Sequence, residues 1–136
     1  NNTAHSFSGS IIVSNGVAYQ GNWYGNYSAC TNVSVTGGAG VNGTFQLNSG
    51  STPTYLPQRY TIAGPGYNNL GALRWTQGND PFAKDITVEA DATCYIGSGL
   101  TVGLTGILGG SGKLTLIVVP VLFACFFKIP TPSSTD

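Results

Sequence analysis

Few side chains in this 136-residue sequence could carry out chemistry, and the clearest candidates are four carboxylates. Asp80, Asp85, Glu89 and Asp91 lie close together in the sequence, and such groups could act as an acid–base pair on a glycosidic bond or bind calcium. On a strand, Glu89 and Asp91 would share one face with other polar residues, which is typical of a solvated surface. The single histidine, His5, has no serine or cysteine motif beside it. We therefore predict that the protein is not an enzyme.

The three cysteines, Cys30, Cys94 and Cys125, allow one intrachain disulfide at most. Cys125 lies in the apolar run Phe123–Phe127, where a thiol behaves as a small hydrophobic group. We therefore predict a disulfide between Cys30 and Cys94, with Cys94–Cys125 as the alternative. The sequence has no Cys-x-x-Cys motif and no cluster of cysteine and histidine, so we expect neither a metal site nor a cofactor.

An aromatic cluster near the N-terminus could bind carbohydrate. Trp23, Tyr24 and Tyr27 follow Tyr19 closely, and exposed aromatic rings stack on the faces of sugars. The same residues could instead pack between two sheets, with their polar atoms left in contact with water. Both interpretations stay open at this point.

The charge distribution excludes one class of partner and indicates a cellular location. The net charge is zero, and residues 1–58 contain no Lys, Arg, Asp or Glu, so we expect no nucleic-acid partner. Four Asn-x-Ser/Thr sequons begin at Asn1, Asn26, Asn32 and Asn42. Attached N-linked glycans would supply the hydration that charges normally give. The first residue is Asn, and we expect a leader to have been removed. These features predict an extracellular glycoprotein.

One apolar run has the composition of a membrane segment but not its length. Residues Leu114–Phe127 carry no charge, yet a spanning helix needs about 20 apolar residues, and Pro120 interrupts this run. Its Val, Ile and Phe content favours strands. We therefore predict one bent strand or a strand pair, buried on both faces, and no spanning of the membrane.

Alternation of apolar and polar residues predicts strands throughout. The clearest example is Asp85–Ile96, where every second residue is apolar. Asn15-Gly16 between Ile11–Val13 and Val17–Tyr19 predicts a hairpin. A second hairpin is expected at Gly109–Gly112, between a strand at Leu100–Thr105 and the strand Leu114–Val119. Further strands are expected at Val33–Val35, Thr44–Leu47, Arg59–Ala63 and Ala72–Gln77. No repeat of fixed period is evident. The pattern predicts an all-β sandwich or barrel of about eight or nine strands.

The N-terminal segment has a pattern that suits two different roles. Phe7, Gly9, Ile11 and Val13 alternate with small polar residues up to Ser10 and would lie on one face of a strand. Residues 1–13 are therefore a candidate donor strand that inserts into a neighbouring subunit, with residues 14–136 as a single β-sandwich domain. The same pattern would suit the first strand of the chain's own sheet.

Low charge, abundant Ser, Thr and Asn, the sequons at Asn26, Asn32 and Asn42, and the strand-like segment Phe7–Val13 occur together. In this combination the sequence resembles the glycosylated thread-type filament subunits of archaea. The resemblance implies an immunoglobulin-like β domain, linkage by donated strands, and a role in adhesion or biofilm formation. We accordingly predict a structural subunit that polymerises with copies of itself and contacts surface glycans or neighbouring filaments. A secreted carbohydrate-binding module, or a virion or surface-layer protein, is the alternative.

Overall fold

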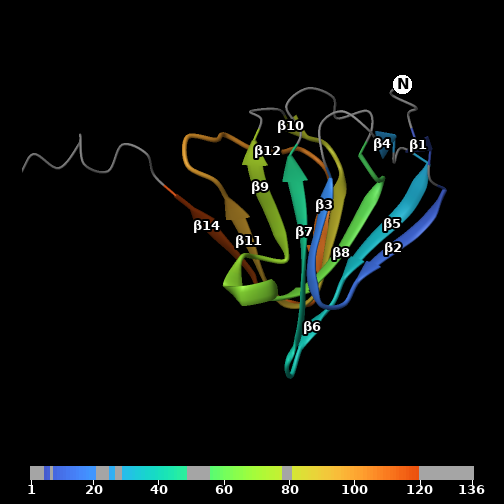
Figure 1. The fold of residues 1–136 in the computed structure, drawn as a ribbon. Helices are drawn as coiled ribbons and strands as arrows, with labels where there is room; N and C mark the ends of the chain where they lie inside the picture. Colours follow the sequence, from blue (N-terminus) through green and yellow to red (C-terminus); the bar gives the residue numbers. More distant parts are fainter. Residues whose placement is uncertain are drawn as a thin grey trace, which may run out of the picture.

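The computed structural model describes residues 5–6, 8–20, 25–26, 29–48, 56–77 and 81–119. These residues form strands almost throughout, with one short 3-10 helix, η2 (Tyr67–Asn69). The main sheet has ten strands, and every pairing along its path β2-β5-β8-β11-β9-β7-β3 is parallel. Because the path passes through β11 and returns, its outline is nearly barrel-like (Figure 1).

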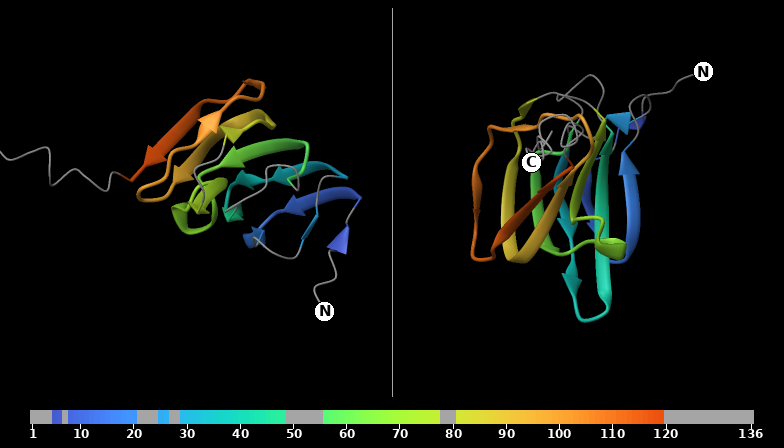
Figure 2. Two further views of the ribbon diagram at one scale, coloured as in Figure 1. Left: turned by 90° about the horizontal axis from the view of Figure 1, so that it is seen from above. Right: turned by 90° about the vertical axis from the view of Figure 1, so that its left-hand side faces the viewer.

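The strand order is that of a chain wound into five stacked coils. Four of the coils, the first three and the last, each have one strand in a first sheet and one strand in a second sheet. The fourth coil is a single long strand whose first part belongs to the first sheet and whose last part belongs to the second. In coil order the strands are β2 (Gly9–Val13) and β3 (Gly16–Gln20), β5 (Cys30–Val35) and β7 (Val41–Asn48), β8 (Arg59–Gly64) and β9 (Leu73–Gln77), β11 (Asp85–Ile96), and β13 (Leu108–Gly110) and β14 (Leu114–Val118). Figure 2 shows the coils following one another in chain order, from blue to orange.

The register confirms that each coil lies directly on the one before. In the first sheet the paired positions are Ile11, Val33, Tyr60, Ile86 and Leu108, and in the second they are Ala18, Phe45, Leu73, Cys94 and Leu116. Neighbouring positions in these rows are unevenly spaced along the chain, closest between Leu73 and Cys94 and farthest between Phe45 and Leu73. The repeat is therefore structural without having a fixed length in sequence.

The corners between the two sheets are short. Strand β11 turns from the first sheet into the second at Glu89, Ala90 and Asp91, all three of which are exposed, while Val88 and Ala92 on either side are buried. In the first coil the corner is Ser14–Asn15, followed by Gly16 with a φ of 83°, which glycine adopts without strain.

The remaining strands are short and lie outside the two sheets' main rows. Strand β6 (Gly37–Gly38) pairs antiparallel with the start of β7. Two parallel pairs, β1 (His5–Ser6) with β4 (Gly25–Asn26) and β10 (Pro81–Phe82) with β12 (Gly103–Leu104), each occupy the position in a coil just before a first-sheet strand.

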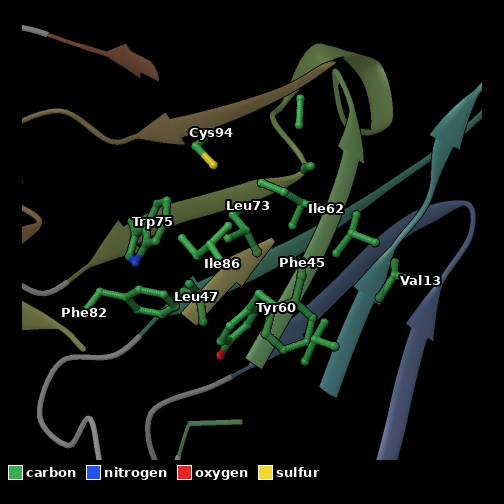
Figure 3. Packing of buried hydrophobic residues seen from close by; sticks show 14 of the residues in the cluster. Val13, Phe45, Leu47, Tyr60, Ile62, Leu73, Trp75, Phe82, Ile86 and Cys94 are labelled. Carbon is green, nitrogen blue, oxygen red and sulfur yellow. The ribbon is translucent and has the colours of Figure 1, made fainter. Parts of the chain in front are cut away.

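The space between the sheets is filled by the inward residues of successive coils (Figure 3). Aromatic rings form its centre: the ring centroid of Tyr60 lies 5.9 Å from that of Phe45 and 5.1 Å from that of Phe82, which in turn lies 5.3 Å from Trp75. Centroid separations in this range are favourable for aromatic pairs. A single continuous core therefore links the coils.

The all-β prediction is confirmed, and the strand predicted at Asp85–Ile96 has the predicted bounds. The immunoglobulin-like sandwich is wrong, because its sheets would be antiparallel and the observed main sheet is parallel. The predicted hairpins are wrong for the same reason. Strands β2 and β3 pair with β5 and β7 instead of with each other. In the second predicted hairpin, Leu100–Thr105 contains only the short strand β12, which pairs with β10, while β14 pairs with β11. The short connections from β2 to β3 and from β13 to β14 turn the chain into the adjacent sheet rather than back along the same one.

Candidate functional site

Two of the four candidate carboxylates, those of Asp85 and Asp91, link neighbouring coils. Asp85 accepts a hydrogen bond from the backbone N–H of Ile107 at 3.0 Å, and Asp91 accepts one from the backbone N–H of Lys113 at 2.9 Å. Both bonds reach from the fourth coil to the fifth. Asp80 lies outside the described residues. Among the residues that are described, no three His, Cys, Asp or Glu side chains gather in a way that could hold a metal ion.

Two of the cysteines are buried and unpaired, so the predicted Cys30–Cys94 disulfide is not formed. Cys30 lies on the second coil in the first sheet and Cys94 on the fourth coil in the second sheet. Two coil spacings of about 4.8 Å already exceed the distance between α-carbons that a disulfide spans. Burial raises the pKa of the Cys94 thiol to about 12, so the thiol is a packing group and not a nucleophile. Cys125, the alternative partner, lies outside the described residues.

The sequons that can be placed lie on or beside strands of the second coil. Asn32, in β5, is half-buried, and its side-chain carbonyl accepts a hydrogen bond from the Thr61 hydroxyl at 3.2 Å. Asn42, in β7, is also half-buried. Asn26 belongs to β4, for which only the backbone is described, and Asn1 lies outside the described residues.

The aromatic residues predicted to stack on sugars, Trp23, Tyr24 and Tyr27, lie outside the described residues. Their neighbour Tyr19 is described and is 56% exposed on β3. It occupies an outward row of the second sheet that continues through Gln46, Arg74 and Tyr95. The guanidinium of Arg74 donates to the side chain of Gln46 at 3.3 Å and lies 5.3 Å from the ring centroid of Tyr95.

The predicted donor strand is part of the chain's own first sheet. Strand β2 pairs with β5 from Gly9 to Val13. Val13 is buried in the core, and Ile11 packs against the core from the edge. Phe7 lies outside the described residues. Because Ile11 and Val13 already pack in the chain's own core, only the outer edge of β2 is free to pair with another strand.

The exposed apolar residues gather at the two ends of the stack. Of the ten large hydrophobic residues that are exposed in the described part of the chain, eight lie on or directly beside a strand of the first or the last coil: Ile12, Val17, Tyr19, Ile107, Leu108, Leu116, Ile117 and Val118. The other two are on the β6–β7 hairpin and in η2. Sequence reasoning missed this pattern because it predicted burial on both faces for the run that contains Leu116, Ile117 and Val118. That prediction is wrong for these three residues, since β14 has a strand on one side only among the described strands.

At the same two ends, strand edges are unpaired. Among the described strands, β2 and β3 each pair on one side only, as do β13 and β14. An open edge presents a row of N–H and C=O groups that can pair with another strand. Apolar side chains and open edges thus coincide on the first and last coils, and these two coil ends are the candidate functional surfaces.

Comparisons with protein-family models, with curated proteins and with solved structures found no match for this chain. Within the described part, no helix has the length and apolar character needed to cross a membrane.

Proposed function

We propose that this protein is a structural, non-enzymatic subunit of an extracellular surface filament, joined to copies of itself by pairing between β-strands. One observation carries the proposal: eight of the ten exposed large hydrophobic residues in the described part of the chain, and the open parallel strand edges, occupy the same two coils, at opposite ends of the stack. Apolar patches of this kind on a protein surface mark interaction sites. A subunit with two different binding surfaces, one at each end, can form an open chain of subunits, because a contact at one end leaves the surface at the other end free for a further copy.

The extracellular location rests on the sequence. The charge-free segment 1–58 and the four sequons within it favour a secreted, N-glycosylated chain. Peptide mass mapping of native material should show glycans at Asn26, Asn32 and Asn42. Unmodified asparagines at all three positions would contradict export through a glycosylating pathway. A filament of this type would serve adhesion or biofilm formation.

The test of polymerisation is a concentration series. Full-length protein should show a weight-average mass, measured by light scattering, that rises steadily with concentration. Negative-stain microscopy of the concentrated samples should show thin unbranched threads. A monomer over the whole concentration range would contradict the proposal.

The outward row of the second sheet supports a second candidate, a secreted carbohydrate-binding module. Tyr19 and Tyr95 supply aromatic faces, and Gln46 and Arg74 between them supply donors that could bind sugar hydroxyls. Binding of monomeric protein to a glycan array, with loss of binding in Tyr19→Ala, would favour this function over the filament.

A further inference from the structure

The last described coil has the inward residues of a core, and no further coil among the described residues covers them. Leu108 and Leu116 continue the two inward rows of the core, next to Ile86 and Cys94 respectively. Leu108 is 53% exposed and Leu116 is 48% exposed, whereas Ile86 and Cys94 are buried. One more coil in the same register would bury both leucines.

The first coil of another copy has the strands that such a coil requires. Strands β2 and β3 have their outer edges free, run parallel to the strands beneath them, and carry Ile11 and Ala18 in the same two inward rows. Ile11 and Ala18 are only partly buried in their own chain. The two coil ends therefore offer matching strands in matching sheets.

The geometry favours head-to-tail stacking over a symmetric contact between two last coils. Stacking a first coil on a last coil aligns the first sheet with the first sheet and the second with the second, so that both edges pair. A two-fold axis across the stack reverses the direction in which the facing coil runs, so a contact between two last coils could pair their strands only antiparallel. Only the head-to-tail contact extends both sheets with the parallel pairing that their strands already have.

We propose that β13 and β14 of one copy pair with β2 and β3 of the next, so that both parallel sheets and the core continue through the joint. This inference rests on the proposed filament and assigns its polarity and register. Leu108 then lies beside Ile11 of the next copy, and Leu116 beside Ala18. On the outer face, Ile117 lies beside Tyr19, and two exposed hydrophobic residues cover each other.

A strand from later in the same chain is a poorer occupant. Leu108 and Gly110 follow their partners Ile86 and Val88 by one coil, and the same step taken once more along the sequence reaches Pro130 and Pro132. The shortest and longest steps in the stack, from Leu73 to Cys94 and from Phe45 to Leu73, would place a residue of 129–136 beside Leu108, and this stretch contains both prolines. Proline has no N–H to donate to a strand ladder and is found at sheet edges and bulges. A second copy supplies Ile11 and Val13 at these two positions instead.

The joint is tested by cross-linking two variants of the full-length chain in a Cys125→Ser background. In the proposed register, Thr115 lies beside Val17 of the next copy. Thr115→Cys and Val17→Cys are prepared separately. Each variant is treated by itself with a short cross-linker that joins two thiols, and a mixture of the two variants is treated in the same way. The mixture should give at least tenfold more cross-linked dimer than either variant alone. Cys30 and Cys94 are buried and provide the background signal.

The alternative occupants give different results. Cross-linking of Thr115→Cys with itself would show a symmetric contact between last coils and overturn the proposed polarity. Filaments of wild-type protein without any Thr115–Val17 cross-link would leave the filament standing and overturn the joint. Monomeric wild-type protein whose β14 amides are nevertheless protected from hydrogen exchange would show that another segment of the chain covers this end, and would overturn both proposals.

A matched pair of substitutions gives a second readout. Leu116→Lys places a charge on the apolar end and should lower the filament mass at a given concentration at least tenfold. Val41→Lys places the same charge at an exposed position on the β6–β7 hairpin and should leave the mass unchanged. Equal effects of the two substitutions would overturn the joint.

Discussion

Leu108 lies directly beside Ile86 in the first sheet and faces the same interior, yet more than half of Leu108 is exposed and almost none of Ile86 is. Among the described strands, Ile86 has a neighbouring strand on either side, whereas Leu108 has a neighbour on one side only. In the part of the chain that the structure describes, the core is thus closed in the middle coils and open at the last coil.

Truncation of these two side chains should have unequal effects on the isolated subunit. Ile86→Ala leaves a cavity in a closed core and should lower the free energy of unfolding by about 2–5 kcal/mol. Leu108→Ala removes a side chain that already contacts water, and should cost under about 1.5 kcal/mol. Urea denaturation of dilute, monomeric protein measures both values. Equal losses would mean that another part of the chain already covers Leu108.

Two adjacent glycines should respond differently to alanine. A Cβ added at Gly37 would lie 2.3 Å from the backbone oxygen of Ala63, whereas one at Gly38 would meet no atom within 4 Å. Gly37→Ala must push β6 away from β8 and should cost about 1–3 kcal/mol, as overpacking does elsewhere. Gly38→Ala is the control, and its unfolding free energy should stay within about 0.5 kcal/mol of the wild type. Similar stabilities of the two variants would contradict this close approach of backbones.

The carboxylate of Asp91 should fix the beginning of β14. It accepts the backbone N–H of Lys113, and Asp91→Ala removes that bond at a net cost of about 1 kcal/mol. Hydrogen exchange of the Lys113 amide should become faster in this variant. Glu89→Ala is the control, since Glu89 is exposed at the same corner and its carboxylate has no partner among the described residues. Unchanged exchange at Lys113 would show that the backbone pairing alone holds the last coil.

The sequence predicted the strands well because they depend on local alternation. Asp85–Ile96 alternates over nearly its whole length, and the prediction fails inside it only at Ala90, which was expected to face the core and is exposed. That residue lies at the corner where β11 leaves one sheet for the other. A strict period of two cannot indicate such a corner, because the direction of the chain changes there while the backbone stays extended.

The pairing of the strands could not be predicted in the same way. Asn15-Gly16 suits a hairpin and also suits the corner of a coil, since both need a residue with positive φ. The choice depends on which pairing of β2 is more stable: pairing with β3, the next strand in the chain, or pairing with β5, which comes a whole coil later. The uneven spacing of the coils along the sequence also hid the repeat. The two coil ends are defined by which strand edges stay unpaired. Because the sequence did not predict the pairing, it did not predict these surfaces either.

Alkaline pH should destabilise the protein through two buried groups. Burial raises the pKa of the Cys94 thiol to about 12, and burial, with a smaller contribution from Cys30, raises the pKa of Tyr60 well above its usual value. In the unfolded chain both groups ionise at lower pH, so above about pH 9 the unfolded state holds fewer protons than the folded state. The free energy of unfolding therefore falls as pH rises, by up to about 1.4 kcal/mol per pH unit for each group.

Denaturation curves at pH 8, 9 and 10 measure this decline, and Cys94→Ala separates the thiol from the rest. The variant should be less stable at pH 8, because it leaves a small cavity, but its stability should fall less steeply between pH 9 and pH 10. The wild-type thiol should also resist alkylation at pH 8 until denaturant is added. The Cys94 thiol lies between Leu73 and Leu116 on the neighbouring strands, and this burial is the reason for its raised pKa. Identical pH slopes for the variant and the wild type would show that the thiol ionises as readily in the folded core as in the unfolded chain, and would contradict the prediction.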